Sequence, residues 1–218
     1  MFFIEVIIRL DTNTWFSGFV YTQTTNRLWR KNRQSRSGQS CVGTDINRNW
    51  PYQWSVSGGA STNPCDETYK GQAAGDTPEM RGLTAFTSTL AASRGIKLYI
   101  DWHSYGQYIL SPFGYNCNAR PSNHALQQTL MGVYSTAIRA VYGTRFTYGP
   151  SCSTLYATTG SSTDYLQAVS GSTYSWTVEL RPGGNSGTSG FVLPAAQILP
   201  SGVEQWEGLK TVLTHSSF

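Results

Sequence analysis

The amino-acid sequence predicts an α/β fold, in which helices flank a β-sheet. Two segments alternate apolar and polar residues as strands do, and each comes after a segment of helical periodicity. Strands that alternate with helices indicate an α/β sheet, and such sheets bind ligands beyond the strand ends. The chain has 218 residues, which is enough for one domain with a sizeable core.

The N-terminal residues 1–17 differ in character from the rest. Phe2–Leu10 predicts a strand, because Glu5 and Arg9 interrupt its apolar run and the run is too short to span a membrane. No small-residue cleavage site of a secretion signal follows it. Residues 26–64 are first polar and basic and then rich in Gly and Ser, and they predict ordered or semi-ordered loops.

The first long helix is predicted to begin after Thr77 and to end at Gly95. Thr77 offers a capping hydroxyl, and Pro78 occupies the first helical position. Leu83 and Leu90 share an apolar face at helical spacing. The segment therefore predicts an amphipathic helix that packs against the sheet.

Residues 96–101 predict the first strand, because apolar and polar residues alternate there. His103 follows just past the predicted strand end, where open α/β sheets place functional groups. It is either functional or a structural histidine satisfied by hydrogen bonds, and the residues alone leave both open. The other histidines, His124 and His215, are predicted surface residues, so the count excludes a His-rich metal site.

The second long helix is predicted from His124 to Tyr142. Gly143 lies where a C-terminal cap is expected. The apolar residues that recur at helical spacing are Leu126, Leu130, Val133, Ala137 and Val141.

Ser175–Arg181 alternates again and predicts the second strand. Glu179 in this strand has two possible roles. It is either a general base, with a pKa raised by partial burial, or the partner of Arg181 in an ion pair. A final helix is predicted where Ser201 and Glu204 fit the capping-box pattern.

An amide and a guanidinium lie side by side at Asn47 and Arg48. Arg offers a bidentate fork to a carboxylate, and Asn adds a further donor. The pair is therefore a candidate carboxylate clamp. An exposed and idle loop pair is the alternative that the residues leave open.

Charge and cysteine content narrow the class of protein. Only 13% of residues are charged and the net charge of +4 is spread thinly, which excludes the basic footprint of a nucleic-acid-binding protein. The four cysteines form an even set without a C-x-x-C pair, which argues against a structural zinc cluster and a redox motif. Two disulfides in an oxidising compartment are favoured over free buried thiols.

Six motifs follow one another in the chain: NRLWRKNR at Asn26–Arg33, CVGTDINRNW at Cys41–Trp50, DWHSYGQ at Asp101–Gln107, LYATTGSSTDY at Leu155–Tyr165, VELRP at Val178–Pro182 and GFVLPAAQILP at Gly190–Pro200. Their order and spacing resemble the carboxypeptidase A family of zinc metallocarboxypeptidases. The resemblance implies a partial metallocarboxypeptidase catalytic domain over residues 18–218, with a mixed, mostly parallel sheet that is incomplete at the N-terminus. Residues 1–17 are then an atypical N-terminal segment.

Carried over residue by residue, the resemblance assigns roles at one active site. It implies that His103 is the third zinc ligand and that Glu179 is the general base and acid. Arg30 is implied to polarise the scissile carbonyl. The residues implied to bind substrate are Asn47, Arg48 and Tyr156 at the terminal carboxylate, Tyr105 in the adjacent subsite and Phe191 in the specificity pocket.

The resemblance also implies the disulfides, the compartment and the partners. Cys41 pairs with Cys65 and Cys117 with Cys152 in this reading, which implies a secreted, extracellular protein. The expected partners are peptide or protein C-termini, with no nucleic acid and no membrane, and the expected state is a monomer. Residues 166–176 contain no acidic residue, so aromatic or aliphatic C-terminal side chains are favoured over basic ones.

The chain departs from the family at the zinc site. The family's His-x-x-Glu motif, which supplies a His and a Glu ligand, lies upstream of every matched segment, and no His precedes His103 here. Zn²⁺ is therefore the expected cofactor with two of its three ligands absent from this chain. The first hypothesis is a truncated zinc metallocarboxypeptidase that hydrolyses the C-terminal peptide bond, with little or no activity in this chain. The alternatives are a non-catalytic domain that binds peptide C-termini and a non-functional fragment.

Overall fold

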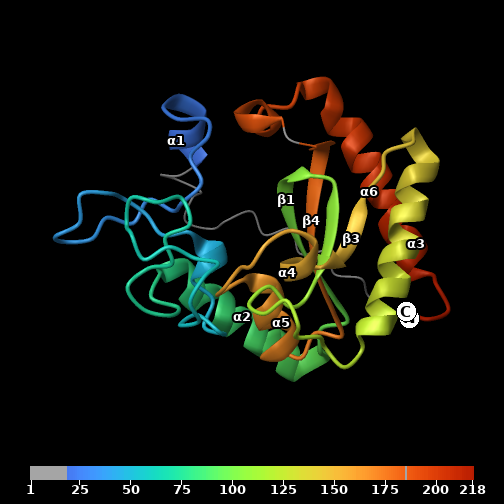
Figure 1. Ribbon diagram of the computed structural model, residues 1–218, viewed down its shortest axis with the longest axis horizontal. Helices are drawn as coiled ribbons and strands as arrows, with labels where there is room; N and C mark the ends of the chain where they lie inside the picture. The colour runs from blue at the N-terminus through green and yellow to red at the C-terminus, as the bar shows by residue number, and fades with distance from the viewer. Residues whose placement is uncertain (1–18, 185) are drawn as a thin grey trace.

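The computed structural model describes residues 19–184 and 186–218, and a mixed β-sheet forms its centre (Figure 1). The strands are β1 (Leu98–Gly106), β2 (Tyr108–Ser111), β3 (Thr147–Pro150) and β4 (Tyr174–Gly183). In this described part their order is β1-β4-β2-β3. β1 runs parallel to β4, β2 runs parallel to β3, and β2 is antiparallel to β4. The predicted α/β fold with a mixed, mostly parallel sheet is confirmed.

Helices cover both faces of this sheet (Figure 1). The α-helices are α1 (Phe19–Thr24), α2 (Pro78–Arg94), α3 (His124–Tyr142), α4 (Ser151–Thr154), α5 (Ser162–Ala168) and α6 (Ile198–Leu213), and the 3₁₀ helices are η2 (Ile46–Arg48), η3 (Gly187–Phe191) and η4 (Ala195–Gln197). α3 and α6 pack on one face around a core that includes Tyr134, Trp176 and Val212. α2 and α5 cover the other face and contribute Met80 and Leu166 to a second core.

The loops predicted over residues 26–64 are confirmed, apart from the short η2 helix. The predicted N-terminal segment, residues 1–17, and its strand Phe2–Leu10 lie outside the described residues. Among the helices that the structure describes, none is long and apolar enough to cross a membrane.

Three predicted elements have the expected positions. The Thr77 hydroxyl caps α2, which ends at Gly95, and α3 ends at Gly143 in the left-handed conformation. The predicted strand Ser175–Arg181 lies within β4. Of the predicted apolar residues of α3, Leu130 is buried and Leu126 and Val133 pack against the core. This helix contacts both the sheet and α6, so it buries other residues as well. The buried residues of α3 are Gln127, Leu130, Met131, Tyr134 and Ile138.

β1 continues beyond the predicted end of the first strand. Its pairing with β4 runs from Leu98 beside Tyr174 to Ser104 beside Leu180. His103 therefore lies inside the strand, and its predicted position past the strand end is wrong. The cause is the neighbouring strand, which supplies hydrogen-bond partners where the apolar alternation of β1 has already ended.

α6 begins earlier than predicted, at Ile198. Pro200 is compatible with the first turn, because the N–H groups there have no acceptor within the helix. The predicted capping box is wrong, since Ser201 and Glu204 lie inside the helix. Glu204 accepts hydrogen bonds from Arg181 instead.

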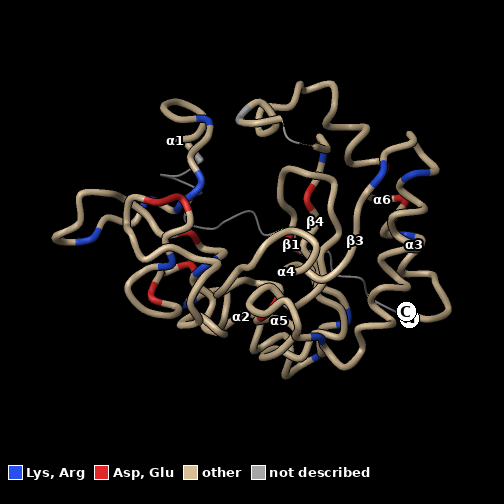
Figure 2. Tube along the Cα trace, in the orientation of Figure 1, with Lys and Arg blue, Asp and Glu red and all other residues tan. Residues whose placement is uncertain are grey.

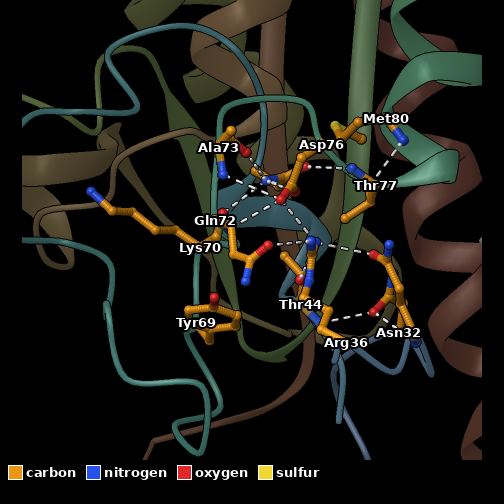
Figure 3. A network of polar contacts seen from close by, with 12 residues as sticks. Asn32, Arg36, Thr44, Tyr69, Lys70, Gln72, Ala73, Asp76, Thr77 and Met80 are labelled. Atoms are coloured by element: carbon orange, nitrogen blue, oxygen red, sulfur yellow. Dashed lines mark hydrogen bonds and ion pairs between the residues drawn. The ribbon is translucent and has the colours of Figure 1, made fainter. Parts of the chain in front are cut away.

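A partly buried polar network orders the long loops before α2 (Figure 3). The Asn49 side chain donates to the carbonyls of Lys70 and Ala73, at 2.7 and 3.0 Å, and to Asp76 at 3.0 Å. The Asp76 carboxylate also binds Arg36 at 2.9 Å. Because Asn49 is the C-terminal cap of η2, this network fixes the position of η2.

Both cysteine pairs form bridges in the structure. The Cα atoms of Cys41 and Cys65 are 5.1 Å apart, and those of Cys117 and Cys152 are 4.7 Å apart. The first bridge joins two of the loops before α2. The second joins the segment after β2 to α4, so each bridge restrains a region with little regular secondary structure.

The contact between α3 and α6 depends on a glycine. A Cβ atom at Gly208 would lie 2.3 Å from the ring of Tyr134 and 2.9 Å from Ile138, and both of these side chains are fully buried. We expect Gly208→Ala to lower the free energy of unfolding by about 1–3 kcal/mol, because the buried ring has no space to move. Gly202→Ala on the same helix meets no neighbour within 4 Å and should stabilise by up to about 1 kcal/mol. Denaturant unfolding measures both variants, and equal stability would contradict this packing.

Candidate active site

The pairing of β1 with β4 places two predicted site residues next to each other. His103 lies beside Glu179 in the parallel register. Paired neighbours on adjacent strands project to the same face of a sheet. Trp176 and Val178 alternate with Glu179 in the chain, and Val178 and Trp176 join the core under α3 and α6. His103 and Glu179 therefore project from the opposite face.

The carboxylate of Asp101 holds His103, and the side-chain amide of Asn47 lies beside it. Its Nε2 atom lies 3.0 Å from Asp101 Oδ2 and 3.1 Å from Asn47 Nδ2. Burial lowers the pKa of His103, but the Asp101 carboxylate and the charge of Glu179 raise it, and the resulting pKa is about 9. At neutral pH the ring is a cation paired with Asp101, so a metal ion would have to displace a proton from it.

Glu179 is a carboxylate without an ion-pair partner in the described part of the chain. Burial raises its pKa, although the positive charges of His103 and Arg30 act in the opposite direction. The alternative role of Glu179, an ion pair with Arg181, is wrong. Arg181 Nε donates to Glu204 Oε1 at 2.7 Å, and Glu204 is fully buried. Glu179 is thus available to accept a proton.

Arg48 is a buried cation without a counter-ion among the described residues. It is 5% exposed, and its Nη1 atom donates to the carbonyl of Asn47 at 2.7 Å. Its Nε atom is buried and has no partner in the described structure. The positive charge acts on Glu179 and lowers the pKa of that carboxyl. Since a buried charge needs a partner, this guanidinium is suited to receive a ligand carboxylate.

Arg30 lies near the same groups but has a partner within the protein. Its Nε and Nη2 atoms contact Asp45 Oδ2 at 3.0 and 2.9 Å. Burial lowers the pKa of Arg30, whereas Asp45, Tyr156 and Glu179 raise it, and the raising effects are larger. Acidic residues in the range 45–79 lie in the same loop region as the basic residues of the range 27–48 (Figure 2), which offsets the basic character of this stretch.

Two of the three predicted aromatic site residues, Tyr105 and Phe191, contact each other. The Tyr105 hydroxyl donates to the carbonyl of Gly187 at 2.8 Å. Its ring meets Phe191 edge to face, with ring centroids 4.9 Å apart. Tyr156 is 54% exposed and lies close enough to raise the pKa of Arg30. Tyr105 and Phe191 therefore make one apolar wall near the end of β1, while Tyr156 acts on the charge of Arg30.

Two further polar residues, Asp101 and Ser162, belong to this site. Asp101 contacts His103, and the hydroxyl of Ser162 donates to Asp101 Oδ2. The backbone N–H of Ser162 donates to Asn47 Oδ1 at 2.9 Å. The polar position of Asp101 in an alternating strand was a signal for it. Ser162 had no such signal, because its partners come from β1 and η2.

The described residues do not by themselves fit a zinc ion. A catalytic zinc site usually has three protein ligands. His103 Nδ1 binds no other described residue, but within residues 19–184 and 186–218 no group of three His, Cys, Asp or Glu side chains could hold a metal. His103 is therefore one candidate ligand of an incomplete set.

The His103–Asp101 pair makes the stability depend on pH. Folding raises the pKa of His103 from 6.5 to about 9, so its stabilisation is complete below pH 6.5 and is lost as pH rises through 9. With a chelator present, we expect the free energy of unfolding to fall by about 2 kcal/mol over this range and Asp101→Asn to flatten the slope. Denaturant titrations at constant ionic strength measure both slopes. An unchanged slope in the variant would show that Asp101 does not set this pKa.

Similarity to known proteins shows which family this chain belongs to. A family model described as zinc carboxypeptidase matches residues 17–208. Metallocarboxypeptidase A of Arthroderma otae is 50% identical over 196 residues, which cover 90% of this chain and 46% of that protein. Carboxypeptidase A1 of Mus musculus is 39% identical over 213 residues, which cover 98% of this chain and 48% of that protein. The chain thus spans about half the length of these curated relatives.

Solved structures give the same result. Bovine thrombin-activatable fibrinolysis inhibitor, in complex with tick carboxypeptidase inhibitor, has a TM-score of 0.83 and 33% identity, over 91% of this chain and 65% of that one. Carboxypeptidase A from Helicoverpa armigera has a TM-score of 0.79 and 32% identity, over 90% of this chain and 48% of that one. The resemblance carried by the six sequence motifs is therefore confirmed, and the chain belongs to the zinc carboxypeptidase family.

Proposed function

We propose that this chain carries the substrate clamp and the general base of a zinc metallocarboxypeptidase, which hydrolyses the C-terminal bond of peptides and proteins. One observation carries the proposal. The guanidinium of Arg48 is buried, has no counter-ion among the described residues and acts on the charge of Glu179. The terminal carboxylate of a peptide supplies the missing negative charge and places the last peptide bond near the base.

Each side chain has a distinct part in this proposal. Arg48 and Asn47 bind the terminal carboxylate, and Tyr156 adds its hydroxyl. Arg30 stabilises the negative charge that develops on the scissile carbonyl oxygen. Glu179 accepts a proton from the attacking water and returns it to the leaving amine, and burial raises its pKa toward the range in which it can do both.

Zinc is the metal that the family name implies, and His103 is its proposed ligand in this chain. In this family of hydrolases the metal activates the water that attacks the peptide bond. The other described residues do not complete a zinc site, so none of the roles above is assigned through the metal.

The proposed substrates are peptide and protein C-termini with aromatic or aliphatic side chains. Tyr105 and Phe191 supply apolar surface beside the site, and no acidic residue in the range 166–176 is available to pair with a basic side chain. The two disulfides support an extracellular location. A monomer that binds neither nucleic acid nor membranes completes the proposal.

A second candidate function follows because the proposed carboxylate clamp is complete among the described residues and the proposed zinc site is not. The described residues include the whole proposed carboxylate clamp but only one proposed zinc ligand, His103. A domain with these groups can bind a peptide C-terminus without hydrolysing it. Retained binding together with absent turnover would favour this function.

Arg48 provides the first test. We expect the chain to bind a short peptide ending in Phe at least about tenfold more tightly as the free acid than as the C-terminal amide, because a charge-assisted bond is lost in the amide. Arg48→Gln should remove this preference. Arg139→Gln, which changes an exposed arginine in the last turn of α3, should retain it. Fluorescence anisotropy measures all the affinities, and equal binding of acid and amide by the parent chain would contradict the clamp.

Metal analysis and hydrolysis provide the second test. We expect the purified 218-residue chain to hold well below one zinc per chain and to release little C-terminal Phe, because one imidazole binds zinc weakly. Glu179→Gln should abolish any release that is observed. Stoichiometric zinc together with release that a chelator blocks would show the expectation wrong and would favour the enzyme over the binding domain.

A further inference from the structure

Ser162 lies where three elements of the candidate site meet. It is the first residue of α5, it is 2% exposed, and it contacts one residue from η2 and one from β1. Its backbone N–H donates to Asn47 Oδ1 at 2.9 Å. Its hydroxyl donates to Asp101 Oδ2. A single residue thus joins the proposed carboxylate clamp to the group that holds His103.

The N–H of Ser162 is free to make this bond because of its position in the helix. The first N–H groups of a helix have no acceptor within the helix. Ser161 is the N-terminal cap of α5, and its hydroxyl accepts from the N–H of Asp164 rather than from that of Ser162. The Ser162 N–H therefore needs an acceptor outside α5, and Asn47 supplies it.

This bond determines which way the Asn47 amide points. A backbone N–H can only donate, so the amide atom that faces Ser162 must be the oxygen. The amide nitrogen then points the other way, where Nδ2 lies 3.1 Å from His103 Nε2. Nδ2 carries two hydrogens, and because the protonated Nε2 of His103 donates to Asp101 and cannot accept, neither hydrogen has an acceptor among the described residues. Asn47 therefore offers a donor to a ligand and keeps its oxygen turned away.

The orientation matters for the charge of the ligand. A carboxylate accepts hydrogen bonds from Arg48 and from an amide N–H, but an amide oxygen in the same place would repel it. Without the Ser162 N–H, nothing among the described residues favours the oxygen in its present position over the reversed amide. The selectivity for a free C-terminus then depends on the orientation of Asn47 as well as on the charge of Arg48.

We propose that Ser162 is a positioning residue whose backbone N–H sets the Asn47 amide for carboxylate binding. The inference rests on the proposed carboxylate clamp, and it assigns part of the selectivity for a free C-terminus to a residue that does not touch the substrate. It concerns the N–H of Ser162 and not the hydroxyl, so the two groups are tested separately.

Ser162→Pro removes the N–H at a position that tolerates proline. Proline is favoured at the first residue of a helix, and Pro78 already occupies that position in α2. The preceding Ser161 has φ −89° and ψ 152°, which is the extended conformation that a residue before proline adopts. The helix should therefore persist while the bond to Asn47 is lost. Ser162→Ala keeps the N–H and removes only the hydroxyl.

The measurement is binding of the Phe-terminated peptide as free acid and as amide. We expect Ser162→Pro to weaken binding of the acid about tenfold and to change binding of the amide less than about twofold, since the lost bond acts only on a charged acceptor. Ser162→Ala should weaken binding of the free-acid peptide by about twofold or less. In a chain that already carries Asn47→Ala, adding Ser162→Pro should alter binding of the free-acid peptide less than about twofold, because the two residues act as one unit.

The outcomes separate this inference from the proposed function. A parent chain that binds acid and amide equally would remove the proposed clamp, whatever the variants do. A parent that prefers the acid, with a Ser162→Pro variant that prefers it equally, would overturn the inference alone. Equal weakening of acid and amide by Ser162→Pro would indicate a structural role, and equal effects of Ser162→Ala and Ser162→Pro would assign the effect to the hydroxyl. Each of these two results would also overturn the inference.

Discussion

The parallel pairing of β1 with β4 is the constraint on which the rest of the molecule depends. It sets His103 beside Glu179, and it turns Trp176 and Val178 into the core under α3 and α6. A shift of one residue in β4 would exchange these faces, burying the carboxylate and exposing the indole. The stability of the core and the position of the candidate site therefore come from the same hydrogen-bond ladder.

Around this ladder, Arg48 and Glu179 are the charged site residues that have no ion-pair partner among the described residues. Arg30, His103 and Arg181 each have an acidic partner within 3.0 Å. Arg48 has none among the described residues, and it is almost fully buried. Such a charge lowers the stability of the folded chain unless a ligand neutralises it, which is a feature of binding sites rather than of structural ion pairs.

Local signals predicted the elements that depend on local physics. The caps of α2 and α3 and the alternation in β4 were read correctly, because a capping hydroxyl, a glycine at a helix end and a period of two act within a few residues. The C-terminal end of β1 and the first residue of α6 were not predicted correctly. β1 continues through His103 because β4 pairs with it there. Glu204 lies inside α6 because the helix already starts at Ile198, and its side chain binds Arg181 on the sheet.

The sequence by itself determined the family, through the order of its motifs, and it identified His103, Glu179 and Arg48 as residues with chemistry to perform. Only the tertiary structure decided how these groups are paired. Arg181 pairs with Glu204, so Glu179 has no ion-pair partner among the described residues. The backbone N–H of Ser162, which is distant in the chain, orients the Asn47 amide. The reason is physical: residue types and periods are local properties, whereas the partner of a buried charge or amide depends on strand register and helix packing, which bring distant segments together.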